Sequence, residues 1–382
     1  MLISIPLLSI YSTPILCFLN PNNATKSYFF IILFIIARFT KRAQFPFRSW
    51  LPAAIAAPTP VSALVHSSTL VTAGVYLIIR FNFIMSGHVI SILITWVGCI
   101  TIILAGGAAL LELDIKKIIA LSTLSQLGII VFTIGLGEIF LSWIHLIRHA
   151  YFKAMIFIGA GAIIHSVRGY QDTRKMGSIN ENNFFISSIF LSGSLRLCGL
   201  PFLSGFYSKD AILEQFFMGS FNTWTCVIVF TATIFTAAYS FRVLSIIFIF
   251  FSSREGLRSE IDSNSRIRAG IFILFFPACV GGLLLRSWNQ SPILVEIPLW
   301  IKLAVLVGLV FTVIILKSLN LNLTPESLLS SGVHQIWFFP LIISPIFSEF
   351  FLKKSKTILK IQELSWSLWL VGGWAAAEKG GV

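Results

Sequence analysis

Ionisable side chains recur at a fixed spacing in one of the most apolar stretches of this 382-residue sequence. In IHLIRHAYFKAMIFIGAGAIIH, every fourth position holds His145, His149 and Lys153, which places the three on one face of an α-helix. Titratable groups aligned in an apolar medium offer successive proton acceptors. This row of His145, His149 and Lys153, called the stripe below, therefore predicts proton transfer. The alternative is a set of polar groups that are simply bonded to neighbouring helices.

A second lysine follows an interrupted apolar helix. Gly199, Pro201 and Gly205 precede Lys209 and Asp210, and a helix break leaves backbone groups that need water or side chains. This favours a proton exit at the break. The alternative is an interfacial Lys–Asp pair that marks the end of a membrane span.

The stretch from Lys41 to Phe81 combines basic groups, an apolar helix and four prolines, Pro46, Pro52, Pro58 and Pro60. Prolines remove backbone donors and interrupt helices, so we predict a broken or hinged span. The run that follows, Val61 to Ile79, is uncharged apart from the ionisable His66. Ionisable groups at membrane depth are costly, which makes Lys41 and His66 functional candidates.

These motifs resemble those of the proton-pumping membrane subunits of respiratory complex I. That family has K-x-A-Q, W-L-P and G-P-T-P-V-S-A-L-x-H blocks, found here in Lys41 to Gln44, Trp50 to Pro52 and Ala57 to Ser68. Its H-x-x-x-H-x-x-x-K and F-Y-S-K-D motifs match the histidine stripe and residues 206–210. The sequence departs from the family at Ala57, which replaces a glycine, and at Arg42 and Arg148, which replace small residues.

The resemblance implies an all-α polytopic membrane protein with an antiporter-like helix bundle. It implies a mitochondrial inner-membrane subunit of the proton-translocating NADH:ubiquinone reductase, in contact with other membrane-arm subunits. NADH, FMN, iron–sulfur clusters and ubiquinone are then expected on those other subunits, with no cofactor on this chain. The implied proton pathway comprises Lys41, His66, His145, His149, Lys153, Lys209 and Asp210.

In this family five or six spans precede the first lysine, and a glutamate on one of them pairs with it. The present sequence has no Asp or Glu before Glu112, so Lys41 has no acidic partner amino-terminal to it. We therefore expect residues 1–40 to hold the remnant of an earlier span and the start of the helix that carries Lys41.

Composition independently indicates a membrane protein. Hydrophobic residues make up 56% and charged residues 11%, and the mean hydropathy is +0.89. The formal charge of +13 comes without a basic face of interleaved polar residues, which argues against nucleic-acid binding. No dinucleotide fingerprint, P-loop, H-E-x-x-H motif or cluster-binding cysteine set is present, so no redox or metal site is expected on this chain.

Apolar segments predict about nine membrane spans. They cover Tyr28 to Phe39, Val61 to Ile79, His88 to Leu110, Ile115 to Leu136, Ile139 to Ile164, Phe184 to Gly219, Asn222 to Phe251, Ile267 to Leu285 and Pro298 to Leu316. Every second connection is basic, namely Leu111 to Lys117, Ser166 to Asn183 and Ser252 to Arg268. The positive-inside rule places these loops on the matrix side.

The sequence divides by pattern into residues 1–40, then a broken lysine helix and histidine span in 41–81. A second half-unit with the His/Lys helix and the second broken helix follows in 82–219, and further spans in 220–316. In 317–382, Ile358, Ile361, Leu364 and Leu368 lie near one helical face among lysines, which predicts an interfacial lateral helix.

Two other function classes stay open from the residues alone. A subunit of a multi-subunit cation/proton antiporter shares the K-x-A-Q and G-P-T-P-V-S-A-L-x-H blocks, while the F-Y-S-K-D motif and the Phe-rich composition favour the complex I family. A membrane scaffold with inert polar residues would keep its function after Lys41 and Lys209 were substituted.

Overall fold

The structure is a computed structural model that describes residues 24–47, 50–82, 88–176, 184–200, 203–218, 223–248 and 265–287, with short pieces between 307 and 357. It divides into two compact units, Met1–Pro325 and Glu326–Val382, and all helices discussed below belong to the first. Every regular element among the described residues is helical, which confirms the all-α prediction.

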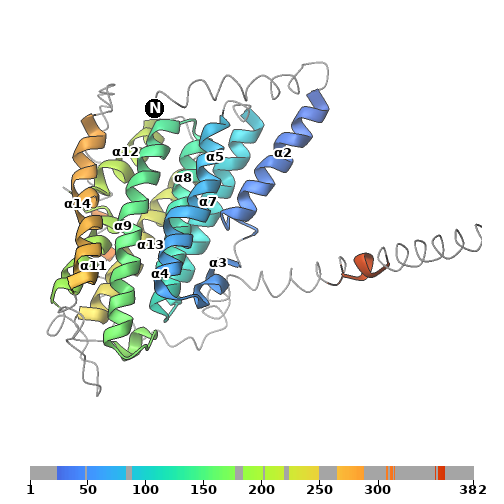
Figure 1. Ribbon diagram of the computed structural model, residues 1–382. Helices are drawn as coiled ribbons and strands as arrows, with labels where there is room; N and C mark the ends of the chain where they lie inside the picture. The colour runs from blue at the N-terminus through green and yellow to red at the C-terminus, as the bar shows by residue number, and fades with distance from the viewer. Residues whose placement is uncertain are drawn as a thin grey trace, which may run out of the picture. The chain divides into compact units, whose positions relative to one another are not determined.

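The helices follow the apolar segments of the sequence (Figure 1). They are α2 (Ala24–Lys41), α3 (Trp50–Ala53), η2 (Ala54–Ala56), α4 (Thr59–Ser62), η3 (Ala63–Thr69), α5 (Leu70–Arg80), α7 (His88–Leu111), α8 (Ile115–Gly135), α9 (Ile139–Ser166), η4 (Thr173–Lys175), α11 (Phe184–Cys198), α12 (Phe206–Met218), α13 (Thr223–Phe248) and α14 (Ser265–Ser287).

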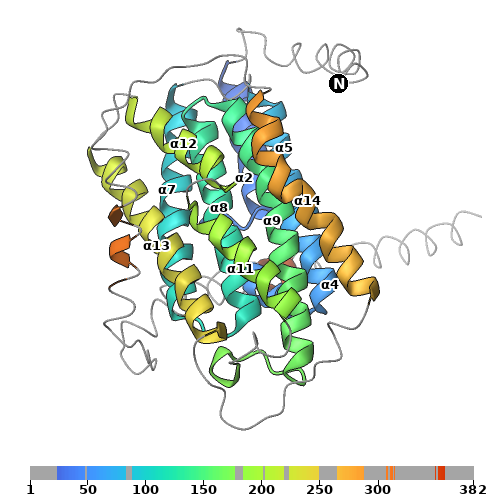
Figure 2. The ribbon, with the colours of Figure 1, turned by 90° about the vertical axis from the view of Figure 1, so that its left-hand side faces the viewer.

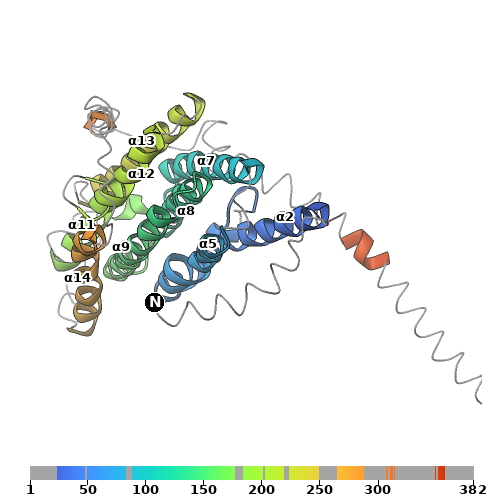
Figure 3. The same ribbon diagram turned by 90° about the horizontal axis from the view of Figure 1, so that it is seen from above.

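Helix α8 is the centre of the bundle, and nearly all of its residues are buried. It packs against α7 and α9, and more lightly against α5 and α13. Seen from above, α2 and α5 lie on one side of α8 and α9, and α11, α12 and α13 lie on the other (Figure 3). Because α8 is apolar over most of its length, other helices can surround it, and the charged residue that it buries, Lys116, lies in its first turn.

Close approach between α7 and α8 depends on a small residue. A Cβ atom built on Gly98 would lie 2.8 Å from the backbone nitrogen of Phe132 on α8. Apolar helices in a membrane gain little from hydrophobic burial against one another, so such close packing supplies much of their association. Any larger side chain at position 98 would push the two helices apart.

The outer faces of the bundle are apolar, as expected for lipid contact. On α7 the exposed side chains include Val89, Ile92 and Trp96, and on α14 they include Phe272 and Ile273. Among the described residues, five helices are long and apolar enough to cross a membrane: Thr59–Arg80, Val89–Leu111, Ile115–Gly135, Ile139–Ser166 and Thr225–Phe248. The chain is therefore a multi-pass membrane protein.

The proline-rich stretch gives the predicted broken span. Helix α2 ends at Lys41, and short pieces α3 and η2 follow before α4 begins with proline in its first turn. Helix α4 continues as η3, a π-helix of seven residues, and then as α5. Wide π-turns inside helices occur often at functional sites, and His66 belongs to this one.

The second predicted break is also present, between α11 and α12. A Cβ atom on Gly205 would lie 2.0 Å from the carbonyl oxygen of Arg196, so the returning chain can pass the end of α11 only because residue 205 has no side chain. The predicted segment Phe184 to Gly219 is thus two helices, and Lys209 lies in the first turns of the second.

Two of the three predicted basic loops meet at one end of the bundle. The segment before α8 and the segment after α9 form a β-bridge between Asp114 and Asp172. The amide of Ile115 donates to the carbonyl of Gln171 at 3.1 Å, and the amide of Thr173 donates to the carbonyl of Leu113 at 2.9 Å. These loops therefore share a side, as the alternation of charge predicted. The third loop, Ser252 to Arg268, lies largely outside the described residues.

Several predictions fall wholly or mostly on residues that the structure does not describe. They are the span Pro298 to Leu316, the lateral helix from Ile358 to Leu368 and the remnant helix before Ala24. The helices α2, α11 and α14 are shorter or less apolar than the five spans given above, and the predicted unit boundaries within 1–316 stay predictions.

Candidate functional site

The histidine–lysine stripe lies on α9 in the interior of the bundle. Helices α8, α11 and α14 pack around α9 (Figure 2), and the side chains of His145, His149 and Lys153 are buried. The ring centroids of the two histidines are 6.4 Å apart. The spacing of four residues has therefore placed the three groups on one buried face, as the sequence predicted.

Lys153 is held by acceptors on α8. Its Nζ atom donates to the hydroxyl of Ser122 at 2.5 Å and to the carbonyl of Ile119 at 3.4 Å. The Ser122 hydroxyl in turn donates to the carbonyl of Ile119 at 2.7 Å. Both acceptors are uncharged, and no ion pair involves Lys153 among the residues that the structure describes.

Lys209 has the same arrangement on other helices. Its Nζ atom donates to the hydroxyl of Thr236 on α13 at 2.6 Å and to the carbonyl of Cys198, the last residue of α11, at 3.3 Å. Thr236 donates its own proton to the carbonyl of Thr233 at 2.7 Å. The helix break supplies one of these acceptors, because the carbonyl at the end of α11 has no partner in a next turn. Asp210 is half-buried and attracts the Lys209 charge electrostatically.

A direct contact joins the stripe on α9 to the broken helix. Nδ1 of His145 lies 3.0 Å from the hydroxyl of Ser208, the residue before Lys209 on α12. Ser208 also donates to the carbonyl of Gly205 at 3.2 Å, so its oxygen can accept a hydrogen bond from the Nδ1–H tautomer of His145. The structure thus brings His145 and Lys209 into one neighbourhood.

His149 lies between the two anchored groups. Neither of its ring nitrogens has a hydrogen-bond partner in the described bundle, and its ring meets Phe152 edge to face at 5.4 Å. Its electrostatic neighbours are Lys153 and His145. An imidazole without a fixed partner keeps both nitrogens available for exchange with either side.

Arg148 introduces a fixed charge beside the stripe. Its side chain is buried, and it interacts electrostatically with His145, as Lys209 does. Arg148, which replaces a small residue of the family, therefore adds its charge to the stripe. Any proton on His145 must coexist with two positive neighbours.

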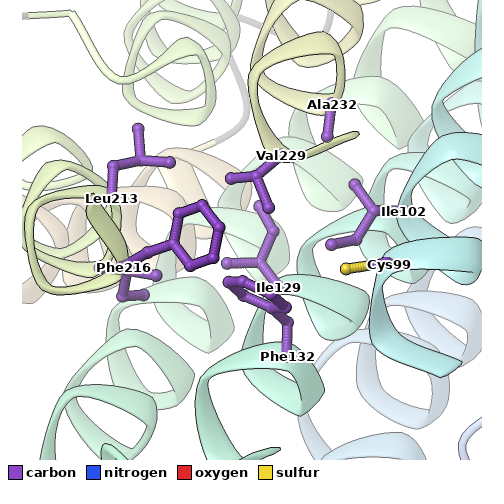
Figure 4. Close-up of a cluster of buried hydrophobic side chains, with 9 residues drawn as sticks. Cys99, Ile102, Ile129, Phe132, Leu213, Phe216, Val229 and Ala232 are labelled. Atoms are coloured by element: carbon purple, nitrogen blue, oxygen red, sulfur yellow. The ribbon is translucent and has the colours of Figure 1, made fainter. Parts of the chain in front are cut away.

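An apolar cluster closes the site beside Lys209 (Figure 4). It combines side chains of α7, α8, α12 and α13, namely Cys99, Ile102, Ile129, Phe132, Ile212, Leu213, Phe216, Val229 and Ala232. The adjoining cavity, which Lys209 helps to line, has a volume of only about 10 Å³. A cavity of that size with few polar groups offers little room for water, so Lys209 has a dry environment on this side.

Lys41 and His66, the candidates from the proline-rich stretch, are placed differently from the stripe on α9. Lys41 is exposed in this chain at the end of α2, whereas its neighbour Arg42 is fully buried. The side chain of Lys41 is therefore not buried among the described residues. The physical reason is the direction of the helix end: the side chain that packs against α5 belongs to Arg42, and Gly74 leaves the room for it. The role of Lys41 in the pathway stays a prediction.

His66 lies in η3, which packs against α9, the helix of the stripe. Its side chain lies outside the described residues. The π-helix and α9 are thus neighbours, while Lys41 is not brought to the stripe.

Reasoning from sequence missed the hydroxyl groups of the site. Ser122 and Thr236 bind the two lysines, Ser208 binds His145, and Ser125 lies 3.3 Å from the hydroxyl of Tyr239 on α13. Serine and threonine are common in membrane helices, so their presence carries little signal. The denser polar group of Ser122, Ser125 and Gln126 in an apolar span was the one available sign.

In the described parts of the chain, no three His, Cys, Asp or Glu side chains are grouped so that they could hold a metal ion. The arrangement instead suits proton exchange among nitrogen and hydroxyl groups.

Comparisons with known proteins agree with this bundle. The family described as NADH:quinone oxidoreductase/Mrp antiporter, TM matches residues 4–236, and NADH dehydrogenase subunit 5 C-terminus matches residues 239–377. In structure, a chain of the Mrp complex from Dietzia sp. DQ12-45-1b is similar with a TM-score of 0.66 and 25% identity. That likeness covers 94% of this chain and 42% of the other. A chain of an archaeal membrane-bound sulfane sulfur reductase shares the fold, with a TM-score of 0.58 and 22% identity.

Curated relatives are named NADH-ubiquinone oxidoreductase chain 5. The Locusta migratoria protein is 46% identical over 287 residues, which cover 73% of this chain and 49% of the relative. The Aedes aegypti protein is 42% identical and the Rattus norvegicus protein 38% identical, over 81% and 87% of this chain. The chain spans about half the length of these relatives. It belongs to the NADH-ubiquinone oxidoreductase chain 5 family.

Proposed function

We propose that this chain moves protons through the mitochondrial inner membrane as a membrane-arm subunit of NADH-ubiquinone oxidoreductase. The observation that carries the proposal is the pair of buried lysines with two buried histidines beside them. Lys153 and Lys209 are each bound by one hydroxyl and one carbonyl, and the stripe on α9 connects with α12 through His145 and Ser208.

Protons would pass between Lys153 and Lys209 by way of the two histidines. The rings of His145 and His149 are 6.4 Å apart between centroids, so transfer between them needs a side-chain rotation or a water molecule. At the other end, Lys209 and Asp210 lie just after the helix break, and a break in a membrane helix favours a route to the surface. Lys41 and His66 would form the part of the pathway that lies in the proline-rich stretch, before the stripe in the sequence.

The redox chemistry would occur elsewhere in the assembly. In this proposal NADH, FMN, the iron–sulfur clusters and ubiquinone are held by other subunits, and this chain holds no cofactor. Electron transfer would then act on the proton pathway through contacts with neighbouring membrane-arm subunits.

Substitution of Lys153 tests the proposal. In the Lys153→Ala variant we expect proton translocation per NADH oxidised to fall more than assembly does, because the stripe loses its terminal amine while Ser122 keeps its bond to Ile119. Lys175→Ala is the control, since that lysine is exposed in the loop after α9. Normal pumping by a fully assembled Lys153→Ala variant would contradict a relay role.

A cation/proton antiporter subunit is the second candidate, because a chain of an Mrp complex has a similar structure with a TM-score of 0.66. Reconstituted membranes separate the two candidates. Sodium/proton exchange without NADH or quinone would support the antiporter, and proton movement that requires electron transfer would support the first proposal.

A further inference from the structure

A basic pocket lies at one end of the bundle, away from the lysine pathway. It is formed where α4 begins, α8 begins and α9 ends, and α4 and α9 are in contact there (Figure 1). Its volume is about 560 Å³, within the range of small-molecule sites. The lining residues are Pro58, Thr59, Lys116, Gly161, Ile164, His165, Arg168 and Gly169.

The charge of this pocket is of one sign. Lys116, His165 and Arg168 supply basic groups, and none of the eight lining residues is acidic. Two carboxylates of the adjoining loops are paired with other cations, Asp114 with Lys117 at 2.8 Å and Asp172 with Arg174 at 2.7 Å. A third, Glu112, interacts electrostatically with Lys117 and Arg242. The pocket therefore offers a positive potential to an anion.

Lys116 is the most constrained of the three basic groups. Its side chain is buried, and its Nζ atom donates to the carbonyl of Ala57 at 3.5 Å. An ammonium group has three donors, so two remain for a ligand in the pocket. His165 and Arg168 are exposed on the opposite wall, which is the end of α9.

The level of the pocket in the membrane indicates which anion it would bind. Three candidate spans end at its walls: one begins at Thr59, one begins at Ile115 and one ends at Ser166. The ends of membrane spans lie at the level of the lipid headgroups, where phosphates are concentrated. An arginine beside a lysine suits phosphate oxygens, because the guanidinium binds them by two parallel hydrogen bonds.

We propose that this pocket binds a phosphate group, supplied by the headgroup of an anionic phospholipid. Lys116 and Arg168 would contact the phosphate oxygens, and His165 would add a further donor. The bound headgroup would fix the ends of α4, α8 and α9 relative to one another. The proposal does not depend on what the lysine pathway transports.

The test uses the chain with its native neighbours, purified into nanodiscs of phosphatidylcholine with increasing fractions of phosphatidylglycerol. We expect retained phosphatidylglycerol in native mass spectra, and a thermal midpoint that rises with its fraction and saturates. In Lys116→Gln and Arg168→Gln, the fraction needed for half the effect should increase about fivefold, the equivalent of about 1 kcal/mol for each basic group. Lys117→Gln is the matched control, because that neighbour is paired with Asp114 and does not line the pocket.

A second arm distinguishes the source of the phosphate. Sodium phosphate is added to pure phosphatidylcholine nanodiscs, and stabilisation that Lys116→Gln removes would support a phosphate site filled from solution. Equal phosphatidylglycerol dependence in the two pocket variants, the control and the unmodified chain would overturn the proposal. It would leave these basic groups with no role beyond packing at the helix ends.

Discussion

Lys153 and Lys209 share a feature that bears on how a lysine changes charge inside a membrane. Each binds a hydroxyl whose own proton goes to the carbonyl three residues earlier, Ile119 for Ser122 and Thr233 for Thr236. The hydroxyl therefore presents a lone pair to the lysine. Because the ammonium and the neutral amine both have N–H donors, this partner holds the nitrogen in either charge state. A carboxylate would instead favour the ammonium.

This argument predicts that the hydroxyls matter to transport and not only to packing. Thr236→Val keeps the shape and removes the acceptor of Lys209, a bond of a class worth about 1.5–3 kcal/mol. Thr233→Val is the control on the same helix, because the Thr233 hydroxyl bonds the carbonyl of Phe230. We expect proton translocation per NADH oxidised to fall in Thr236→Val and to stay near normal in Thr233→Val.

Assembly, followed by native gels, and thermal stability separate the two effects. If both variants pump equally well at equal assembly, the hydroxyl at Thr236 is a packing group and the argument fails.

At the scale of helices, the positions of the breaks could be predicted because proline and glycine act locally. Pro58 and Pro60 lie at the start of α4, and Gly205 lies at the turn into α12. The stripe on α9 was predictable for a similar reason, since its spacing fixes one face whatever surrounds the helix. The exposure of Lys41 and the π-helix at His66 depend on which neighbour each helix end meets, and periodicity carries no information about that contact.

The loops at the basic end also form an element with a measurable pH dependence. Asp172 accepts hydrogen bonds from the backbone nitrogen of Arg174 at 3.1 Å and from its Nη2 at 2.7 Å. These bonds to Arg174 hold the pKa of Asp172 below its ordinary value, although partial burial acts in the opposite direction. The backbone of Asp172 also forms the β-bridge to Asp114 that joins the α7–α8 and α9–α11 connections, so this ion pair lies beside the bridge.

The lowered pKa of Asp172 in the folded state fixes the direction in which stability changes with pH. The pair contributes stability above the unfolded pKa of aspartate, about 3.9, and the contribution is lost as the pH falls through the lower folded pKa. We expect amide exchange protection at Thr173 and Ile115, corrected for intrinsic rates, to fall between about pH 5 and pH 3. Arg174 is largely exposed, so solvent screening keeps the effect small. Asp172→Asn should remove most of this pH dependence, and an unchanged profile in that variant would contradict the assignment.

At the scale of the whole bundle, the two ends differ in charge. The end formed by the α7–α8 and α9–α11 connections carries Lys116, Lys117 and Arg168, together with Arg174 and Lys175. The turn between α8 and α9, at the other end of both helices, contains Glu138 and no basic residue. If the chain lies in the inner membrane as proposed, retention of basic loops on the side of synthesis would place the first end in the matrix.

Cysteine labelling tests this orientation on residues that the structure places. Tyr170→Cys lies in the exposed loop after α9, and Glu138→Cys lies at the start of α9. An impermeable maleimide added to mitoplasts, whose exposed face is the intermembrane one, should label position 138 and leave 170 unlabelled, with the reverse in inside-out particles. The chain without either substitution gives the background from its native cysteines.

Labelling of position 170 from the intermembrane side would invert the topology. The orientation of the helix break before Lys209 would be inverted together with α9, because α12 contacts α9 through Ser208 and His145. Agreement at both positions would place the phosphate pocket on the matrix side, since Lys116 and Arg168 belong to the same two connections.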